Sequence, residues 1–504
     1  MLELDPAHCY RVLQSRDPRF DGRIFVGVTS TGIYCRPICP ARTPKSENCR
    51  FFPTAAAAQA SGFRPCLRCR PETAPGQGAW RGASNTVSRA LRLIAEGGLD
   101  EEASVGSLAE RLGVGERQLR RLFRQHLGAS PVAIAQTRRV HFAKQLIHET
   151  SLPMAQVALA SGFGSIRRFN DTFSKLFKRP PMELRRRGLR DAGEAAAPVT
   201  LRLNYRGAYD WDAMLGFLGA RAIAGVEVVA GQRYRRVVRV GEAVGGIEVS
   251  HLAARRCLVV TIRFPDVRAL PIIVSRLRGL FDLDADLDAI GEHLSQDARL
   301  APLVARRPGL RTPGCWDGFE LAVRAILGQQ VTLQAGRTLA SRITAAFGAR
   351  LETGVAAGDA LTRVFPTPSQ LARADLGMMG LTTARAAALK ALAVAAADDP
   401  RLFEQAASLD EAIARFRALP GIGEWTAQYI ALRALREADA FPAADIGLMQ
   451  GFACSSSGLG DGQPRPSPKQ LLEQAEAWRP WRAYAAQHLW AAYAERAPAK
   501  SKAA

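Results

Sequence analysis

The sequence has no apolar run long enough to cross a membrane and no low-complexity region. Its first residues, MLELDPAHCYRVL, lack the basic segment, the apolar stretch and the small-residue cleavage site of a secretory signal. Both absences argue against an exported or membrane protein, so we expect a cytoplasmic one. The nine cysteines then favour free thiols or metal ligands over disulfides, because the cytoplasm keeps thiols reduced.

A single hydrophobic core cannot organise 504 residues, so roughly three or four domains are expected. Two stretches rich in proline, glycine and small residues, 71–84 and 188–200, are predicted linkers. A third such stretch, 455–468, is a predicted loop inside the last domain, because a helical pattern resumes after it.

The positive charge is unevenly distributed along the chain. The formal net charge is +21, and residues 81–190 alone carry 20 Lys and Arg against 9 Asp and Glu. Basic charge concentrated in this way favours a polyanionic partner, with nucleic acid the first candidate. Generic solubility is the simpler alternative.

The basic segment contains an internal repeat, at 104–131 and 151–181. In each copy a helical apolar pattern is followed by a glycine-containing turn and a second helical pattern. The apolar positions are Leu108, Leu112, Leu119, Leu122 and Phe123 in the first copy, and Val157, Phe169, Phe173 and Phe177 in the second. This plan predicts two helix-turn-helix units, each with one face of its second helix free for a DNA major groove. An ordinary helical bundle with a solvated basic face is the alternative.

The repeat resembles the AraC-type DNA-binding domain, most clearly in the stretches ASGF and FSKLFKRPP. The resemblance implies a tandem helix-turn-helix domain at 84–188, whose two second helices enter successive major grooves. The side chains that would contact DNA are Arg117, Gln118, Arg121, Arg167 and Arg168.

Four cysteines form two close pairs, Cys35 with Cys39 and Cys66 with Cys69, and 26 residues separate the pairs. The spacings C-x3-C and C-x2-C are typical of a tetrahedral four-cysteine zinc site, whereas Cys9 and Cys49 have no close partner. In a small module with a thin core, zinc binding would add ~10–16 kcal/mol of apparent free energy to folding.

Arginines cluster around these cysteines, among them Arg36, Arg42 and Arg64. A zinc-bound thiolate beside arginines that hold a phosphate could attack an electrophile on that phosphate. The residues alone therefore leave two roles open, a structural zinc clip and a reactive thiolate.

The stretch GVTSTGIYCRPICPAR, together with GFRPC and CRPE, closely resembles the N-terminal methyl-phosphotriester repair domain of Ada. The resemblance implies an α+β zinc domain at 1–75, in which Cys35 accepts a methyl group from a DNA phosphotriester. Cys35, Cys39, Cys66 and Cys69 would hold Zn²⁺, and Arg36, Arg42 and Arg64 would contact the DNA. Methylation removes negative charge beside the DNA, so DNA affinity would rise and repair would act as a switch. The chain lacks the Pro-Cys-His-Arg context of Ada's second acceptor, so no transfer from guanine oxygen is implied.

The C-terminal region begins with a mixed pattern and becomes helical. A predicted helix at 210–222 is followed by three β-rich runs, at 232–240, 245–252 and 256–264. A second helix is predicted at 267–283, and from about 310 nearly everything has helical periodicity.

A hairpin turn, Leu-Pro-Gly-Ile-Gly at 419–423, lies between two of these helices. Gly421 and Gly423 would let backbone N–H groups approach a DNA phosphate at the start of the next helix. An aspartate, Asp445, follows 22 residues after Gly423.

This spacing, together with YDWDAMLGFL, GLRTPGCWDGFELAVRAILGQQV and WRPWRAYAAQHLW, closely resembles the AlkA-type DNA-3-methyladenine glycosylases. The resemblance implies an α+β N-terminal domain at 199–305 and a helix-hairpin-helix glycosylase domain at 306–497. Asp445 would stabilise the oxocarbenium-like sugar and orient water, although helix capping is its plainer role. Trp425 stands where related lyases carry a nucleophilic lysine, so hydrolysis by water is expected.

The same resemblance implies an aromatic pocket for an electron-poor, often cationic base, with walls formed by Phe217, Trp425, Tyr429 and Trp490. Each of these side chains has plain core packing as its alternative role. The family inserts an apolar wedge where the damaged base is flipped out. The aligned position here is Gln330, which is polar.

We therefore predict a multidomain, mainly α protein with α+β parts, acting in bacterial cytoplasm near the nucleoid. It would bind Zn²⁺ and double-stranded DNA, both damaged and promoter DNA, as a monomer that touches no membrane. Its predicted activity is hydrolysis of the N-glycosidic bond of alkylated bases, with suicidal methyl transfer to Cys35. The alternative is a methylation-switched transcriptional activator whose C-terminal region only binds DNA.

Overall fold

The computed structural model describes residues 4–75, 85–100, 103–185, 198–351, 360–455 and 465–496. The predicted connecting segments 71–84, 188–200 and 455–468 lie largely outside these ranges. Residues 84 and 186–188 of the predicted DNA-binding domain at 84–188, the reader, also lie outside them. Within the described ranges, every helix is too short or too polar to span a lipid bilayer.

The N-terminal module is a small sheet with helices beside it. Its strands are β1 (Phe25–Val28), β2 (Ile33–Cys35), β3 (Cys49–Phe52) and β4 (Arg64–Pro65), in the order β3-β1-β2-β4. Its helices are α1 (Pro6–Ser15) and α2 (Ala55–Ala60), with 3-10 turns η1 (Pro18–Phe20), η2 (Ser46–Asn48) and η3 (Pro71–Thr73). Four buried residues, Phe25, Tyr34, Ala58 and Phe63, form a core that is small for a module of this length.

Six helices and a 3-10 turn follow. They are α3 (Asn85–Ala95), α4 (Val105–Arg111), α5 (Glu116–Leu127), α6 (Pro131–Glu149), α7 (Met154–Ala160), α8 (Ile166–Phe177) and η4 (Pro181–Leu184). The turn inside each repeat is made by a glycine in the left-handed region, Gly113 at φ 70° and Gly162 at φ 75°. The apolar residues predicted for the second helices face inward, as Leu119 and Phe173 do with 0% exposure. The predicted helix-turn-helix repeat is confirmed, and the long helix α6 joins the two copies.

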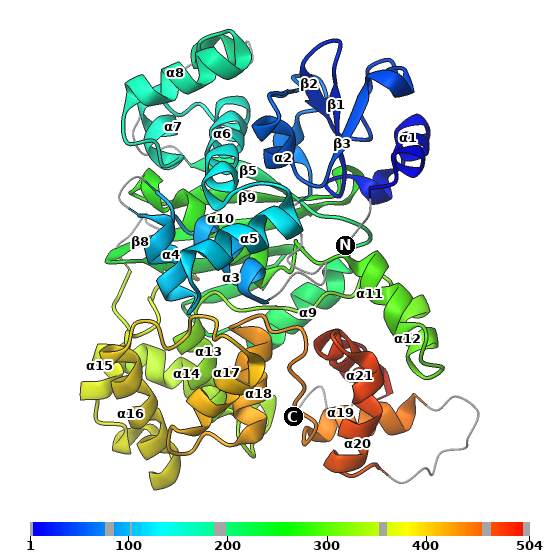
Figure 1. Ribbon diagram of the computed structural model, residues 1–504. Coiled ribbons are helices and arrows are strands. Elements are labelled where there is room, and N and C mark those ends of the chain that lie inside the picture. The colour runs from blue at the N-terminus through cyan, green and yellow to red at the C-terminus, as the bar shows by residue number, and fades with distance from the viewer. Residues whose placement is uncertain are drawn as a thin grey trace.

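A five-stranded antiparallel sheet occupies the middle of the molecule, as Figure 1 shows. Its strands are β5 (Val199–Asn204), β6 (Glu227–Ala230), β7 (Arg233–Val240), β8 (Ala243–Leu252) and β9 (Cys257–Arg263), in the order β5-β9-β8-β7-β6. The helices α9 (Trp211–Arg221) and α10 (Leu270–Leu280) belong to the same part of the chain. The three predicted β-rich runs match β7, β8 and β9, whereas β5 and β6 were not predicted.

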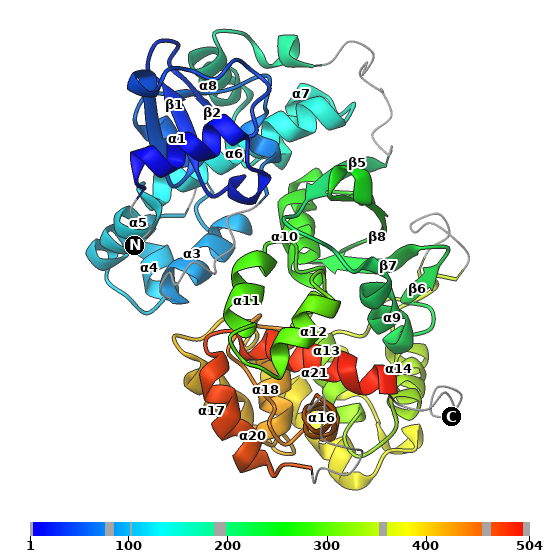
Figure 2. The same cartoon turned by 90° about the vertical axis from the view of Figure 1, so that its right-hand side faces the viewer.

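The remaining chain is helical, as predicted, and is divided between two buried clusters. The helices are α11 (Leu287–Leu294), α12 (Leu300–Arg306), α13 (Gly318–Leu327), α14 (Leu333–Phe347), α15 (Pro368–Arg373), α16 (Thr383–Asp398), α17 (Leu409–Arg417), α18 (Glu424–Arg433), α19 (Ile446–Cys454), α20 (Pro468–Ala475) and α21 (Arg482–Arg496), with 3-10 turns η7 (Gly377–Met379) and η8 (Glu476–Trp478). Two further turns, η5 (Ala253–Arg255) and η6 (Val267–Ala269), belong to the part that carries the five-stranded sheet. Figure 2 shows α18 and α21 close together beneath α11 and α12.

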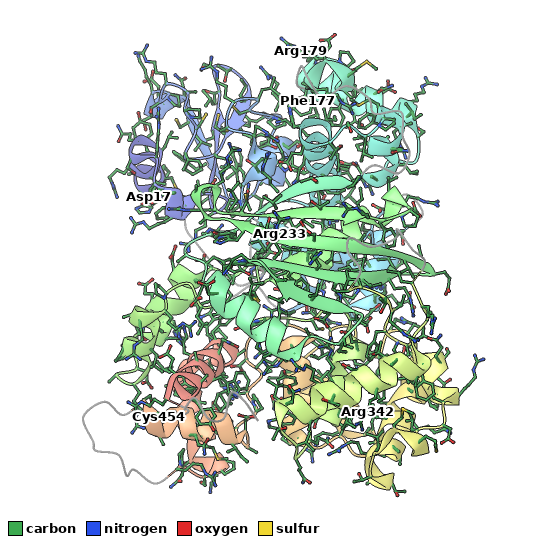
Figure 3. The ribbon with its side chains drawn as sticks, turned by 180° about the vertical axis from the view of Figure 1, so that it is seen from behind. Asp17, Phe177, Arg179, Arg233, Arg342 and Cys454 are labelled. Carbon is green, nitrogen blue, oxygen red and sulfur yellow. The ribbon has the colours of Figure 1, made fainter. Side chains whose placement is uncertain are left out.

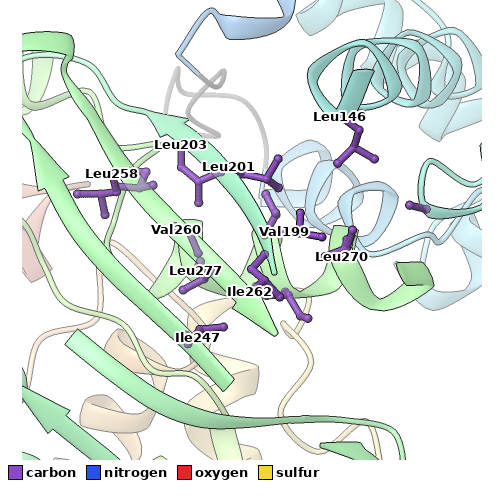
Figure 4. Packing of buried hydrophobic residues seen from close by; sticks show 14 of the residues in the cluster. Leu146, Val199, Leu201, Leu203, Ile247, Leu258, Val260, Ile262, Leu270 and Leu277 are labelled. Atoms are coloured by element: carbon purple, nitrogen blue, oxygen red, sulfur yellow. The ribbon is translucent and has the colours of Figure 1, made fainter. Parts of the chain in front are cut away.

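The reader helices pack directly on the central sheet. Leu146 of α6 and Phe169 of α8 belong to the same buried cluster as Leu201 of β5 and Leu270 of α10. Figure 4 shows Leu146 beside the strand residues Val199 and Leu201. In Figure 3, Phe177 and Arg179 lie at the opposite end of the molecule from Arg342 and Cys454. The second half of the reader and the helical C-terminal region therefore lie at opposite ends of the molecule, whereas α4 of the first half contacts the C-terminal region through the ion pair of Arg111 with Glu404.

Candidate functional site

The two cysteine pairs meet because β2 and β4 run parallel and adjacent. Ile33 pairs with Arg64 and Tyr34 with Pro65, so Cys35 and Cys66 both follow at the same end of the sheet. The sulfur atoms of Cys35, Cys39, Cys66 and Cys69 all lie within 4.8 Å of one another. A tetrahedral Zn²⁺ with bonds of about 2.3 Å places its sulfurs roughly 3.8 Å apart, which this cluster accommodates. The predicted zinc site is confirmed.

The four ligands differ in exposure. Cys39, Cys66 and Cys69 are buried, at 6%, 6% and 7% exposure, whereas Cys35 is half-buried. The backbone N–H of Arg36 donates to the Cys69 sulfur at 3.3 Å, and that of Arg68 donates to the Cys66 sulfur at 3.4 Å. Such donors stabilise thiolates without competing for the metal. Cys35 is therefore the ligand most open to a reaction partner.

The three arginines predicted to contact DNA lie in different environments. Arg36 is held inside the module by an ion pair with Asp21 and donates to the Cys69 carbonyl oxygen at 3.1 Å. It also donates to the Thr73 hydroxyl at 2.7 Å, so its guanidinium fixes the loop that carries the cysteines. Arg42 is exposed and Arg64 is half-buried.

The N-terminal module that carries the four cysteines, the metal module, is joined to α6 by a buried ion pair that the sequence did not indicate. Lys144 Nζ lies 2.8 Å from a Glu72 carboxylate oxygen, and both side chains are 0% exposed. Lys144 also donates to the carbonyl oxygen of Cys66 at 3.4 Å and lies 5.4 Å from the centre of the Phe177 ring in α8. One side chain thus contacts a zinc ligand's backbone and the second reader helix.

The Glu72→Gln variant is expected to lose about 3 kcal/mol of unfolding free energy, because Lys144 would keep a buried charge without a carboxylate partner. Thermal unfolding of the full chain measures the loss. The double variant Glu72→Gln with Lys144→Met removes both charges and should recover most of it. A double variant no more stable than the single one would contradict this account of the pair.

The reader residues predicted to contact DNA lie on exposed helix faces. Arg117, Gln118 and Arg121 of α5 and Arg167 and Arg168 of α8 are all exposed. The first turn of α8 is capped by the Ser165 hydroxyl, which accepts from the Arg168 N–H at 3.2 Å. Both second helices therefore offer a basic face to a major groove.

In the helical C-terminal region, Asp445 lies at the start of α19 and accepts three hydrogen bonds. The Leu448 N–H donates to Oδ1 at 2.9 Å, so Asp445 is the N-cap of α19. Helix capping was the plainer of its two expected roles. The indole N–H of Trp490 also donates to Oδ1, at 2.8 Å, and that of Trp425 donates to Oδ2 at 2.9 Å. The carboxylate is half-buried and is held in one orientation by two tryptophans.

Three of the four predicted pocket walls surround one arginine, and the fourth, Trp425, stacks on one of the three. The rings of Trp425 and Tyr429 stack 5.4 Å apart at an interplanar angle of 9°. The guanidinium carbon of Arg433 lies 4.7 Å from the Phe217 ring centre, 5.1 Å from that of Trp490 and 5.7 Å from that of Tyr429. Trp425, Tyr429 and Arg433 are each four residues apart, so they lie on one face of α18. That spacing could have identified Arg433 from the sequence.

The predicted hairpin joins α17 to α18. Gly421 has φ 77°, and an added Cβ there would meet the Cβ of Ala388 at 2.4 Å, so both space and conformation require glycine. Gly423 is the N-cap of α18, and its side of the turn is open. The Gln329 amide donates to the Gly421 carbonyl oxygen and to the Thr426 hydroxyl, both at 3.0 Å. Gln330, beside it, is exposed with φ 54°.

Three known domain families match parts of this chain. They are the metal binding domain of Ada over residues 8–72, a helix-turn-helix domain over 108–187 and the AlkA N-terminal domain over 200–317. The "Probable bifunctional transcriptional activator/DNA repair enzyme AlkA" of Mycobacterium tuberculosis (strain ATCC 25618 / H37Rv) is 42% identical over 96% of this chain and 96% of its own length. The chain belongs to this family.

Two further similarities concern the C-terminal part of this AlkA-type bifunctional chain. The "DNA-3-methyladenine glycosylase 2" of Escherichia coli (strain K12) is 36% identical over 57% of the chain and 95% of its own length. The solved 3-methyladenine DNA-glycosylase from Archaeoglobus fulgidus has a TM-score of 0.51 at 21% identity, over 59% of the chain and 99% of that protein, which shows a shared fold. The predicted fusion of Ada-like, helix-turn-helix and AlkA-like parts is confirmed.

Proposed function

We propose that this protein repairs alkylated DNA in two ways and that its reader couples one of them to transcription. The proposed parts are a methyl-acceptor domain at 1–75, a reader at 84–188, an AlkA-type N-terminal domain at 199–305 and a glycosylase domain at 306–497. The resident metal is Zn²⁺. The protein binds bacterial chromosomal DNA in the cytoplasm, and it does so as a monomer.

Base excision is assigned to Asp445, and the observation that supports this most strongly is the pair of indole donors on its carboxylate. A carboxylate fixed on both oxygens is preorganised to face positive charge that develops on the sugar as the glycosidic bond breaks. It also orients the attacking water. Because Trp425 occupies the position of the lyase lysine, no Schiff base forms and water completes the reaction.

The base is proposed to stack among Phe217, Trp425, Tyr429 and Trp490. Each wall belongs to a different helix or turn of a helix, so a flipped base would meet π faces from more than one side. The hairpin glycines Gly421 and Gly423 would hold a backbone phosphate, because the α18 N-terminus offers free N–H groups. Gln330 would fill the vacated stack from its exposed position.

Methyl acceptance is assigned to Cys35 because it is the most exposed of the four ligands. The Cys35 thiolate would attack the methyl carbon of a phosphotriester, forming a thioether while the phosphate leaves as a diester anion. When bound, zinc keeps the four sulfurs deprotonated. Arg42 and Arg64 are proposed to hold the phosphate, while Arg36 contributes by fixing the cysteine loop.

The reader is proposed to bind promoter DNA through α5 and α8, more tightly once Cys35 carries the methyl group. A gel shift with promoter DNA, before and after methylation of the chain, tests this. The alternative function, a regulator whose C-terminal region only binds DNA, predicts no release of bases from alkylated DNA. Release of free 3-methyladenine by the purified chain separates the two.

A further inference from the structure

The arginine at the centre of the aromatic cluster, Arg433, has no role in the function proposed above. It is 2% exposed, and three of the four proposed pocket walls lie within 5.7 Å of its guanidinium carbon. Its Nη1 donates to the Pro313 carbonyl oxygen at 2.8 Å, and its Nη2 donates to Gln487 Oε1 at 3.0 Å. These bonds hold the guanidinium in one place against the rings.

Arg433 carries a positive charge that no acidic group offsets. Among the described residues, no carboxylate forms an ion pair with it, and the acceptors of these two hydrogen bonds are neutral. Burial lowers the pKa of Arg433 to about 10, so it remains protonated at neutral pH. A buried cation held only by neutral acceptors and aromatic faces is costly to keep, which favours a functional role.

The two charges of the site contact the same aromatic groups at different points. The Trp490 indole N–H donates to Asp445, while the ring of Trp490 faces Arg433 at 5.1 Å. Trp425 likewise donates to Asp445 and stacks on Tyr429, which contacts Arg433. Asp445 and Arg433 therefore border one aromatic cluster, so a base stacked on these rings lies close to the guanidinium charge.

This polarity matches one class of substrate. When the bond from C1′ to the base nitrogen breaks, its electron pair stays on the nitrogen. A cationic base, such as a purine methylated at N3 or N7, leaves as a neutral molecule and gains nothing from a nearby cation. An uncharged damaged base leaves as an anion, which a fixed guanidinium stabilises.

We propose that Arg433 is a specificity-determining residue that stabilises the departing base and extends excision to uncharged damaged purines. The proposal rests on the glycosylase function assigned above. The departing anion takes a proton from water, the sugar gains the remaining hydroxide at C1′, and the products are the free base and an abasic site. Against a cationic base the same guanidinium is neutral or slightly unfavourable.

The test compares two duplexes, one with a single hypoxanthine and one with a single N7-methylguanine, under single-turnover conditions with the full chain. Arg433→Met is expected to lower hypoxanthine release about 100-fold, as for removal of one transition-state donor, and to leave N7-methylguanine release within about threefold. Arg433→Gln, which keeps a donor but loses the charge, is expected to show the same preference. If Arg433→Met does not fold, Arg433→Gln tests the proposal in its place. Arg433→Lys restores the charge and should recover most of the hypoxanthine activity.

A matched control is Arg221→Met. The guanidinium carbon of Arg221 also lies over the Phe217 ring, 3.9 Å from its centre, but Arg221 has no cation–π contact with Trp490 or Tyr429 among the described residues. Its loss should change both rates by the same factor. If every Arg433 variant also lowers both rates equally, Arg433 is structural and the proposal is overturned. If the unaltered chain releases neither base, the glycosylase assignment itself fails, which is a distinguishable result.

Discussion

The Asp445→Asn variant is expected to release alkylated bases about 1000-fold more slowly than the unaltered chain, a loss of roughly 4 kcal/mol of transition-state stabilisation. The amide keeps an oxygen for the Leu448 N–H, so the cap of α19 survives. What it lacks is the negative charge that opposes the oxocarbenium-like sugar. Single-turnover release of 3-methyladenine from methylated DNA measures the effect.

The control for this variant is Asp317→Asn. Asp317 is also an N-cap, of α13, and accepts from the Glu320 N–H at 2.9 Å, but within the part of the chain that the structure describes no indole N–H donates to it. The same chemical change there should leave base release unaltered. A similar loss in both variants would mean that capping, and not charge at the sugar, explains the result at Asp445. Undiminished base release by Asp445→Asn would show that Asp445 takes no part in the reaction.

The Cys35→Ala variant is expected to accept no methyl group from DNA carrying methyl phosphotriesters, because the nucleophile is absent. Mass spectrometry of the peptide that contains residue 35 detects the transfer. The control is Cys49→Ala, since Cys49 is half-buried yet lies outside the zinc cluster. That variant should become methylated like the unaltered chain.

Zinc content shows whether the metal module of the variant stays intact, and the location of the methyl group separates a reactive Cys35 from a purely structural one. Three cysteines still bind zinc, although more weakly, so Cys35→Ala should retain part of its zinc at neutral pH. A methyl group found on Cys39, Cys66 or Cys69 instead would move the acceptor to another ligand. Unmethylated protein after full exposure to the DNA would support the structural clip.

Much of this architecture was predictable because local patterns dominate it. The paired cysteines, the two helix-turn-helix copies and the glycine hairpin are each specified by residues close together in sequence. The strands β7, β8 and β9 were predicted because they are long and bounded by turns. β5 was missed because its partner, β9, is remote in sequence. β6 was missed because it has only four residues, although its partner β7 follows after a two-residue turn.

The contacts between parts of the chain were not predictable. Lys144 and Glu72 are 72 residues apart and become an ion pair only when α6 packs on the metal module. Arg36 was predicted to contact DNA from its position beside Cys35, and its pairing with Asp21 depends on the fold of η1 and β1. Side chains of this kind give no periodic signal, because their partners come from other elements.

Lys144 contacts both the Cys66 carbonyl oxygen and the Phe177 ring. These contacts indicate how methylation of Cys35 would change DNA binding by the reader. The metal module and α8 both contact this side chain of α6, so they are packed together through it. A change in charge at the zinc cluster would then be felt by DNA held on α8 without a large motion. This arrangement favours an electrostatic switch over a hinged one.

The most direct test of the whole account is a single incubation of the full chain with duplex DNA that carries both methyl phosphotriesters and methylated bases. Free bases are measured in the solution, and the mass of the peptide containing Cys35 is measured in the protein. The account predicts catalytic release of 3-methyladenine together with one methyl group on Cys35 and none elsewhere. Intact alkylated bases with an unmodified Cys35 would contradict it.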